Sequence, residues 1–270
     1  MRAFKMDFHV HSDFSPDSQT PMVEMIEHAI EIGVTDLCFT DHIDLDYDLS
    51  VPQGDWLFDQ KGYFQSIETY RKRYPSLKIY AGVELGLQPH LGKRYMELLH
   101  PYDYDFIIGS THTVSGHDLY RKEFFNSQTP LNAIRTYYEE LLKSIEAFNG
   151  YQVIGHLDLY TRYDARTRKV LFKDYFDWVE VLLKKLIELG KGIEVNSGGF
   201  RYHLEDNNPS RELLKLYKEL GGEVITLGSD AHGPEALGYR YEDNIELLKS
   251  LGFQYLSVFE KQGLIMKKII

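Results

Sequence analysis

The chain has 270 residues, of which 43% are hydrophobic, and carries a formal net charge of -11 at pH 7. This length can bury a large core, and we treat residues 1–270 as a single domain. The negative charge argues against long, sequence-independent nucleic-acid binding. With one cysteine, Cys38, no intramolecular disulfide can form. No signal-peptide pattern or apolar run of membrane-spanning length is present, so we expect a cytoplasmic protein.

Seven short apolar runs predict strands, and the longer segments between them have helical spacing. The predicted strands cover residues 4–11, 36–42, 78–84, 105–112, 152–156, 192–197 and 223–230. The predicted helices cover residues 21–33, 63–73, 131–148, 173–190, 210–221 and 241–251. Strand and helix alternate without a low-complexity linker, which predicts an α/β fold with a parallel sheet.

The sheet is expected to close into a barrel, with an open doubly wound sheet as the alternative. A barrel collects functional groups from the carboxyl ends of nearly all its strands, whereas an open sheet uses one switch point. Ionisable residues end six of the seven runs: His11, His42, Glu84, His112, His156 and Asp230. This distribution favours the barrel. Residues 43–62 and 113–130 are predicted to be loops that overhang the same end.

The first strand carries two histidines, His9 and His11, which the two-residue period of a strand places on one face. A single pair of this kind is weak evidence, because a buried imidazole is often satisfied by backbone groups. The argument lies in the whole set of donors that would meet at one rim: His9, His11, Asp17, His42, Glu84, His112, His156, Asp230 and His232. His28, His90, His100 and His117 are expected on the surface.

Nine nitrogen and oxygen donors are too many for one ion and suit two or three divalent metals with shared carboxylates. Zn, Mn and Fe all fit such a donor set. Two adjacent ions can lower the pKa of a trapped water to about 7 and withdraw charge from a phosphoryl oxygen. The sequence therefore predicts a metal-dependent hydrolase, most consistent with cleavage of a phosphate ester.

These motifs resemble the polymerase and histidinol phosphatase (PHP) superfamily over nearly the whole chain, and within it the histidinol-phosphate phosphatases. They read Asp-Phe-His9-Val-His11-Ser, Thr-Asp-His42, Gly-Val-Glu84, Gly-Ser-Thr-His112, Ile-Gly-His156, Glu-Val-Asn196-Ser and Gly-Ser-Asp230-Ala-His232. Together they are highly specific for the superfamily and less so for the substrate. The resemblance implies a distorted (β/α)7 barrel with up to three metals.

The resemblance also implies how the ligands divide. The first metal would use His9, His11, Glu84 and Asp230, the second Glu84, His112 and His156, and the third Asp17, His42 and His232. Asp17 is a departure, since some members of the superfamily carry histidine there. A hydroxide shared by the first two metals would attack phosphorus, and Asp230 or His232 would protonate the leaving alkoxide.

Two arginines are predicted to bind the phosphate. Arg162 and Arg201 each follow a predicted strand end, and guanidinium groups grip phosphate oxygens in a bidentate fork. The ammonium and imidazole of L-histidinol phosphate would face an acidic, aromatic loop through charge and stacking. Its residues are Asp44, Asp46, Asp48, Asp55 and Trp56, for which a solvated surface loop is the alternative.

Other functions stay open at this point. Other branches of the superfamily act as nucleases or nucleotide phosphatases, and a phosphotyrosine-protein phosphatase would need the same chemistry. A non-catalytic metal-binding module is a different class, which the complete set of ligand positions argues against. The predicted partner is a small phosphorylated molecule, with no membrane and no long nucleic acid, and the oligomeric state is unknown.

Overall fold

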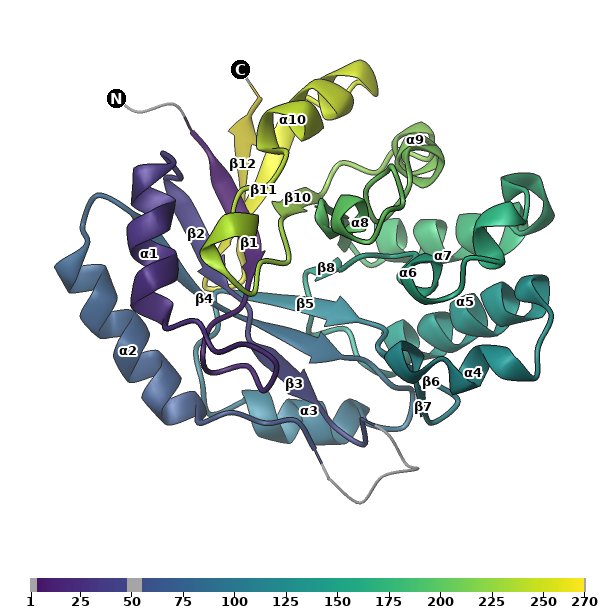
Figure 1. The fold of residues 1–270 in the computed structure, drawn as a ribbon, viewed down its shortest axis with the longest axis horizontal. Coiled ribbons are helices and arrows are strands. Elements are labelled where there is room, and N and C mark those ends of the chain that lie inside the picture. The colour runs from purple at the N-terminus through teal and green to yellow at the C-terminus, as the bar shows by residue number, and fades with distance from the viewer. Residues whose placement is uncertain (1–3, 48–54, 270) are drawn as a thin grey trace.

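The computed structural model describes residues 4–47 and 55–269, and its centre is a ring of parallel strands (Figure 1). Each strand pairs with its neighbours in the order β1, β2, β4, β5, β8, β9, β10. These strands are Met6–Val10, Asp36–Phe39, Lys78–Gly86, Phe106–Ser110, Val153–Ile154, Gly192–Asn196 and Ile225–Gly228. All seven coincide with predicted runs, although most are shorter.

The ring closes between its first and last strands. The amide of Asp230 donates to the carbonyl of His9 at 2.8 Å, and the amide of His11 donates to the carbonyl of Ala231 at 2.8 Å. Val10 and Ala231 form a parallel bridge. The barrel is distorted, because β8 has only two residues and the pairing of β1 with β2 shifts register between Asp7 and Val10. The predicted distorted seven-stranded barrel is therefore confirmed over the open sheet.

Helices lie around the outside of the ring (Figure 1). The six predicted helices are α1 Met22–Glu31, α2 Gln60–Arg73, α5 Pro130–Ala147, α7 Phe176–Glu188, α9 Arg211–Glu219 and α10 Tyr241–Ser250. Four shorter helices were not predicted: α3 Gly92–Leu99, α4 Glu123–Asn126, α6 Tyr160–Tyr163 and α8 Gly198–Arg201. Two of the predicted helices begin at side-chain caps, where Asp59 accepts from the amide of Gly62 and Thr129 from that of Asn132.

Several further elements were not predicted from the sequence. The strand β3 His42–Asp44 pairs with β4 just beyond β2. Residues 113–130 are not simply a loop, because they contain the hairpin of β6 Thr113–Val114 and β7 His117–Asp118, followed by α4. An antiparallel hairpin at the C-terminal end pairs β11 Tyr255–Glu260 with β12 Gly263–Lys268. Short 3-10 turns cover Leu119–Arg121, Thr167–Lys169, Phe172–Asp174 and Pro234–Ala236.

The C-terminal hairpin packs against the barrel through aromatic side chains. Phe259 of β11 stacks on Phe106 of β5 with ring centroids 5.2 Å apart, and Phe106 meets Phe8 of β1 at 5.4 Å. The carboxylate of Asp105 accepts from the amide of Lys261 at 2.9 Å, which ties the hairpin turn to the start of β5. The hairpin thus completes the core at the end where the strands begin. Among the described residues, no helix is long and apolar enough to span a membrane.

Truncating Phe106 should destabilise the fold markedly. The substitution Phe106→Ala removes a fully buried ring that contacts two other aromatic residues, so we expect it to cost about 3–5 kcal/mol in unfolding free energy. The matched control Leu264→Ala, at a side chain that is 46% exposed in β12, should change it by no more than about 0.5 kcal/mol. Urea denaturation followed by circular dichroism measures both, and equal effects would contradict the packing described.

Candidate metal centre

The structure brings all nine predicted ligands to the end of the barrel where the strands terminate. His9 and Glu84 lie within β1 and β4, His42 begins β3, and the others follow strands directly or in the next turn. All of them except His9 and His11 line a cavity of about 1030 Å³. These two do not line it and are completely buried. The surface positions expected for His28, His90, His100 and His117 are also confirmed, since all four side chains are at least partly exposed.

Glu84 occupies the centre of this group and is completely buried. Its two carboxylate oxygens lie 2.8–3.4 Å from ring nitrogens of His9, His11, His42, His112 and His156. His9 lies in the first strand and His11 directly follows it, whereas the other three come from different strands, so their convergence depends on the closed barrel. A carboxylate surrounded by nitrogen donors at this spacing can bridge two cations, as shared carboxylates do in multinuclear sites.

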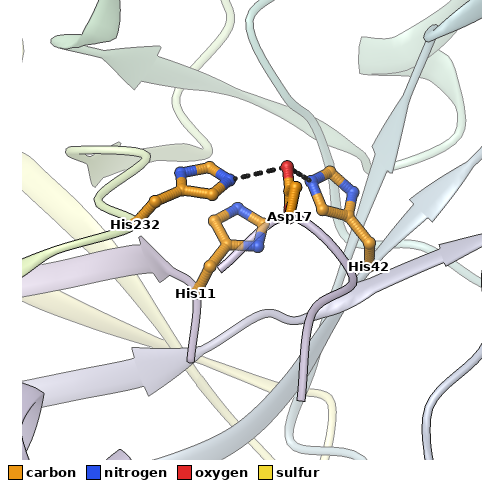
Figure 2. Close-up of side chains that lie close together, drawn as sticks. All are labelled: His11, Asp17, His42 and His232. Carbon is orange, nitrogen blue, oxygen red and sulfur yellow. Dashed lines mark hydrogen bonds and ion pairs between the residues drawn. The ribbon is translucent and has the colours of Figure 1, made fainter. Parts of the chain in front are cut away.

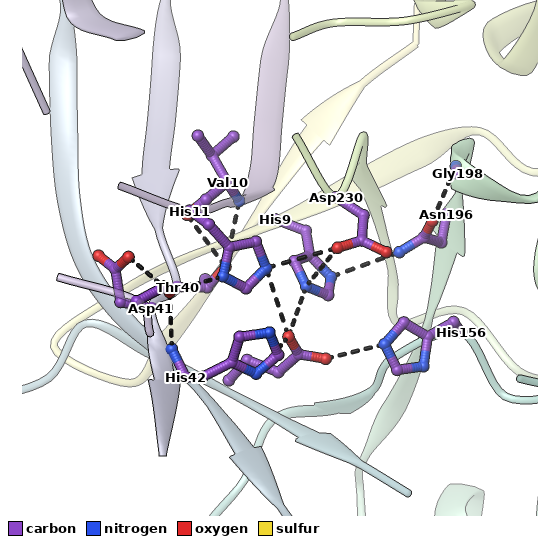
Figure 3. A network of polar contacts seen from close by, with 12 residues as sticks. His9, Val10, His11, Thr40, Asp41, His42, His156, Asn196, Gly198 and Asp230 are labelled. Carbon is purple, nitrogen blue, oxygen red and sulfur yellow. Dashed lines mark hydrogen bonds and ion pairs between the residues drawn. The ribbon is translucent and has the colours of Figure 1, made fainter. Parts of the chain in front are cut away.

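Within the first predicted ligand set, His11 has the spacing of a metal ligand rather than that of a hydrogen-bonded group, whereas His9 Nε2 lies 3.0 Å from Glu84 Oε2. The Nε2 atom of His11 lies 3.4 Å from both Glu84 Oε2 and Asp230 Oδ1 (Figure 3). It is buried and has no hydrogen-bond partner in the part of the chain that the structure describes. Ligands held tetrahedrally at about 2.1 Å from one ion are roughly 3.4 Å apart. The donor atoms of His9, His11, Glu84 and Asp230 therefore enclose a position that suits one ion.

A second compact group holds the predicted ligands of the third site (Figure 2). Asp17 Oδ2 lies 3.0 Å from Nε2 of His232 and 3.5 Å from Nε2 of His42. His11 stacks beside both histidines and its ring completes the group. Aspartate in place of histidine thus still reaches this group, where it presents an oxygen donor.

The second predicted site differs in one residue from the predicted set. Compact donor geometry joins His42, Glu84 and His112. His156 lies next to this group, with Nε2 2.8 Å from the same Glu84 oxygen that His112 approaches at 3.1 Å. His42 thus stands between the second and third groups. The three groups overlap through shared residues, as expected of a multinuclear centre.

Each of four ligand histidines has its Nδ1 atom on a neighbouring oxygen acceptor. His9 faces Glu194 Oε1 at 2.7 Å, and His112 faces Asp44 Oδ1 at 2.7 Å. His232 faces the carbonyl of Asp230 at 3.1 Å. Carboxylates and carbonyls only accept, so each Nδ1 carries a proton. Each Nε2 also faces a carboxylate, of Glu84 or Asp17, and a metal bound there would take the place of its proton.

The fourth, His11, is oriented through a serine. Its Nδ1 lies 3.0 Å from Ser15 Oγ, and that hydroxyl donates its only proton to Asp41 Oδ1 at 2.8 Å. The hydroxyl must therefore accept from His11, which leaves the lone pair on Nε2. Asp41 is fully buried and also accepts from the amide and hydroxyl of Ser12. A carboxylate thus directs each of these rings except that of His232.

Sequence reasoning missed these orienting carboxylates. Glu194 lies inside the apolar strand Gly192–Asn196, where an acidic residue is unusual, and that signal could have identified it. Asp41 directly precedes His42 and could have been found in the same way. Nothing local in the sequence marks Ser15 as the partner of His11, because their contact depends on the fold of the turn after β1.

Burial and neighbouring charges shift the pKa values of the groups in the centre in different directions. Burial, with the nearby rings of His232 and His42, lowers the pKa of His11 to about 3, so this ring is neutral. Burial alone would lower the pKa of His9 as well, but the carboxylates of Glu194 and Glu84 raise it well above its usual value. Burial opposes ionisation of Asp230, yet His9 and Arg162 hold its pKa well below its ordinary range. The carboxylates therefore remain ionised and attract cations.

Both predicted substrate arginines line the cavity. Arg162 is buried, and its guanidinium donates to Asp230 Oδ2 at 2.8 Å and to the side-chain oxygens of Asn196 and Asn208. Arg201 donates through Nη2 to the carbonyl of Asp230 at 2.7 Å, whereas its Nη1 is buried without a partner. Arg162 is thus fixed beside a predicted ligand, and Arg201 keeps donor capacity for an anion.

The acidic-loop interpretation is wrong for two of its residues. Asp46 and Asp55 both pair with Arg94, each at 2.8 Å, and neither lines the cavity. Asp44 lines the cavity but its carboxylate is turned toward ligand histidines. Trp56 lines the cavity as predicted and stacks on Tyr47, and Asp48 lies outside the described residues.

Comparisons with known proteins agree with this geometry. Residues 7–198 match the family model described as the PHP domain. The chain is 29% identical over 268 residues to the histidinol-phosphatase of Lactococcus lactis, covering 94% of each chain. It is 28% identical to a probable histidinol-phosphatase of Clostridium acetobutylicum, covering 95% of this chain and 97% of that one.

A solved structure is similar over nearly the whole chain. It is the histidinol phosphate phosphatase of Lactococcus lactis in complex with zinc, L-histidinol and phosphate. The TM-score is 0.87 at 28% identity, and the match covers 97% of this chain and 98% of that one.

Replacing the central carboxylate should lower the number of metal ions bound per chain. In Glu84→Gln an amide, which cannot bridge two cations, faces imidazoles from several strands, so we expect at least one ion per chain to be lost after reconstitution with Zn or Mn. Elemental analysis after gel filtration measures the ratio. The control Asp46→Asn, outside the centre, should keep the wild-type ratio, and a Glu84→Gln variant with that same ratio would contradict the assignment.

Proposed function

Since the chain belongs to the PHP domain family, we propose that it is a metal-dependent phosphatase that hydrolyses L-histidinol phosphate to L-histidinol and phosphate. The observation that carries this proposal is the overlap of three donor groups beneath one cavity with two arginines in its wall. This combination suits a phosphate monoester, since cations and guanidinium groups both stabilise charge on phosphoryl oxygens. The substrate assignment is supported by similarity to histidinol-phosphatases along nearly the whole chain.

The residues present fit divalent metals. His11 Nε2 is a buried nitrogen without a partner, and the carboxylates of Glu84 and Asp230 lie at ligand spacing around it. We propose the nine predicted residues as the ligands, with Glu84 shared between the first two sites. Bound ions supply Lewis acidity and a water of lowered pKa.

The arginines bind the substrate phosphate in this proposal. Arg201 carries the donor best suited to a new oxygen, because its Nη1 atom has no partner among residues 4–47 and 55–269. Arg162 is held by Asp230, Asn196 and Asn208, so its guanidinium is oriented before substrate arrives. Preorganised donors of this kind need no rearrangement as charge moves onto the phosphate.

Proton transfer to the leaving alkoxide is assigned to Asp230 or His232. His232 is the more exposed of the two, but it acts as an acid only when its Nε2 holds a proton rather than a third-site ion. The Asp230 side chain is 9% exposed, with one oxygen on Arg162 and the other at the first ligand set. The His232 side chain is 34% exposed, stands at the cavity wall and points Nε2 at Asp17. A general acid must reach the leaving oxygen, which the more exposed ring does more readily.

Small substrates suit the molecule better than polymers. The net charge of -11 repels polyanions away from the metal centre, where local cations no longer dominate. We therefore propose a small phosphate ester as the substrate, without long nucleic acid as a partner, and we propose the cytoplasm as the place of action.

The decisive experiment is phosphate release from L-histidinol phosphate by chelator-stripped protein reconstituted with Mn, Zn or Fe. We expect turnover only after metal is restored, and strong preference for this substrate over a nucleoside monophosphate and a phosphotyrosyl peptide. Turnover of only the nucleotide or the peptide would keep the metal chemistry and refute the substrate. Metal-replete protein inactive on all three esters would refute the proposed function.

Substituting Arg201 tests the phosphate contact. In Arg201→Lys the planar fork and the unpartnered Nη1 donor are lost, so kcat/KM should fall roughly 10–100-fold, the value of one or two hydrogen bonds to a charged group. The control Arg94→Lys changes an arginine that pairs with Asp46 and Asp55 outside the cavity, and its steady-state kinetics should match wild type. Unchanged kinetics in Arg201→Lys would remove Arg201 from the substrate site.

A further inference from the structure

We propose that Asp44 is a positioning residue that orients the ligand imidazoles of two neighbouring metal sites at once, His112 of the second site and His42 of the third. The inference rests on the proposed metal centre and assigns Asp44 no contact with substrate. It replaces the role in amine binding that the sequence suggested for this residue.

The carboxylate of Asp44 lies between the two rings. Its Oδ1 accepts from Nδ1 of His112 at 2.7 Å. Its Oδ2 lies 3.3 Å from Nδ1 of His42, a contact without hydrogen-bond geometry among the described residues, and the same Nδ1 lies 3.4 Å from Glu84 Oε2. The Asp44 side chain is only 3% exposed, so water does not compete for these oxygens. With both Nδ1 atoms directed at a carboxylate, each ring directs its lone pair on Nε2 away from Asp44. That atom faces Glu84 in His112 and Asp17 in His42.

The backbone around Asp44 fixes this carboxylate in place. Asp44 ends β3, and its amide and carbonyl exchange hydrogen bonds with Trp56 at 2.9 and 2.7 Å. On its other side β3 pairs with β4, which sets Asp44 opposite Gly86. A Cβ atom at Gly86 would collide with Asp44 Oδ1. Glycine at position 86 therefore makes the space that the carboxylate occupies.

The first site does not depend on Asp44. His9 is oriented by Glu194, and His11 by Ser15 with Asp41 behind it. Glu194 and Ser15 lie on different segments from Asp44, whereas Asp41 directly precedes His42 but binds Ser12 and Ser15. The Ser15 hydroxyl accepts from the backbone amide of His42, not from its ring. Loss of Asp44 should therefore weaken the second and third sites and spare the first, a selectivity that a general packing role would not produce.

The substitution Asp44→Asn tests this selectivity, because the amide keeps the shape but offers only one acceptor. Whichever ring faces the amide NH2 group must accept through Nδ1 and carry its proton on Nε2, where it can no longer bind metal. We expect at least one ion per chain to bind 10–100-fold more weakly, while the first-site ion keeps its affinity. Competition with a chelator, read as bound Mn or Zn per chain by elemental analysis, measures these affinities without substrate.

Two further variants complete the test. Gly86→Ala keeps Asp44 but displaces its carboxylate, so it should reproduce the selective loss. Asp46→Asn removes the next acidic side chain, which pairs with His90 and Arg94 instead, and should bind metal as wild type does.

The proposal is overturned if Asp44→Asn binds every ion as wild type does, or if a folded Asp44→Asn weakens all sites equally. It also fails if wild type holds only one ion, because the sites served by Asp44 would then be absent. These outcomes are independent of the substrate. Failure to turn over L-histidinol phosphate, with selective metal loss in Asp44→Asn, would refute the proposed function and leave the role of Asp44 intact.

Discussion

Glu84 is a fully buried carboxylate whose oxygens face imidazole nitrogens from five other positions. An isolated charge in such a place would cost several kcal/mol, so the surrounding donors have to be held there by the fold. The barrel does this by ending its parallel strands at one rim. Closure between β1 and β10 matters most, because it brings His9 and His11 beside Asp230. The architecture and the metal centre therefore depend on each other.

The buried acids outnumber the fixed cations of the centre. Behind the ligands stand the carboxylates of Asp41, Asp44 and Glu194, whereas Arg162 supplies the buried guanidinium. Without bound metal, protonated histidines offset part of this negative charge, because carboxylates raise the pKa of His9 and His112 despite their burial. Divalent ions replace those protons with a larger charge at fixed positions. The acids that orient the rings thus also make the site strongly selective for cations.

The alternation of strands and helices could be predicted from the sequence, and so could the gathering of ionisable residues at one end of the barrel. Both follow from patterns among residues that are close together in the chain. Neither β3 nor the C-terminal hairpin could be, since β3 depends on pairing with β4 and the hairpin on packing against Phe106. The proposed ligands could be named from strand ends and motifs. Of their orienting groups, Glu194 and Asp41 carry a local signal that was overlooked, whereas the contact of Ser15 with His11 appears only in three dimensions. Asp46 was misjudged because its arginine partner lies 48 residues away.

Two glycines lie close to the proposed ligands, and close packing explains why neither position can carry a side chain. A Cβ at Gly228 would collide with Glu194 and His9, just as one at Gly86 would collide with Asp44. In each case the missing side chain leaves room for a carboxylate that orients a ligand ring. Asp230, two residues after Gly228, adopts a left-handed φ of 58°, which aspartate tolerates better than most residues. The strand ends are therefore shaped as much by the carboxylates behind the histidines as by the ligands themselves. The motif Gly-Ser-Asp230 thus contains both a glycine that makes room for Glu194 and a proposed ligand, Asp230.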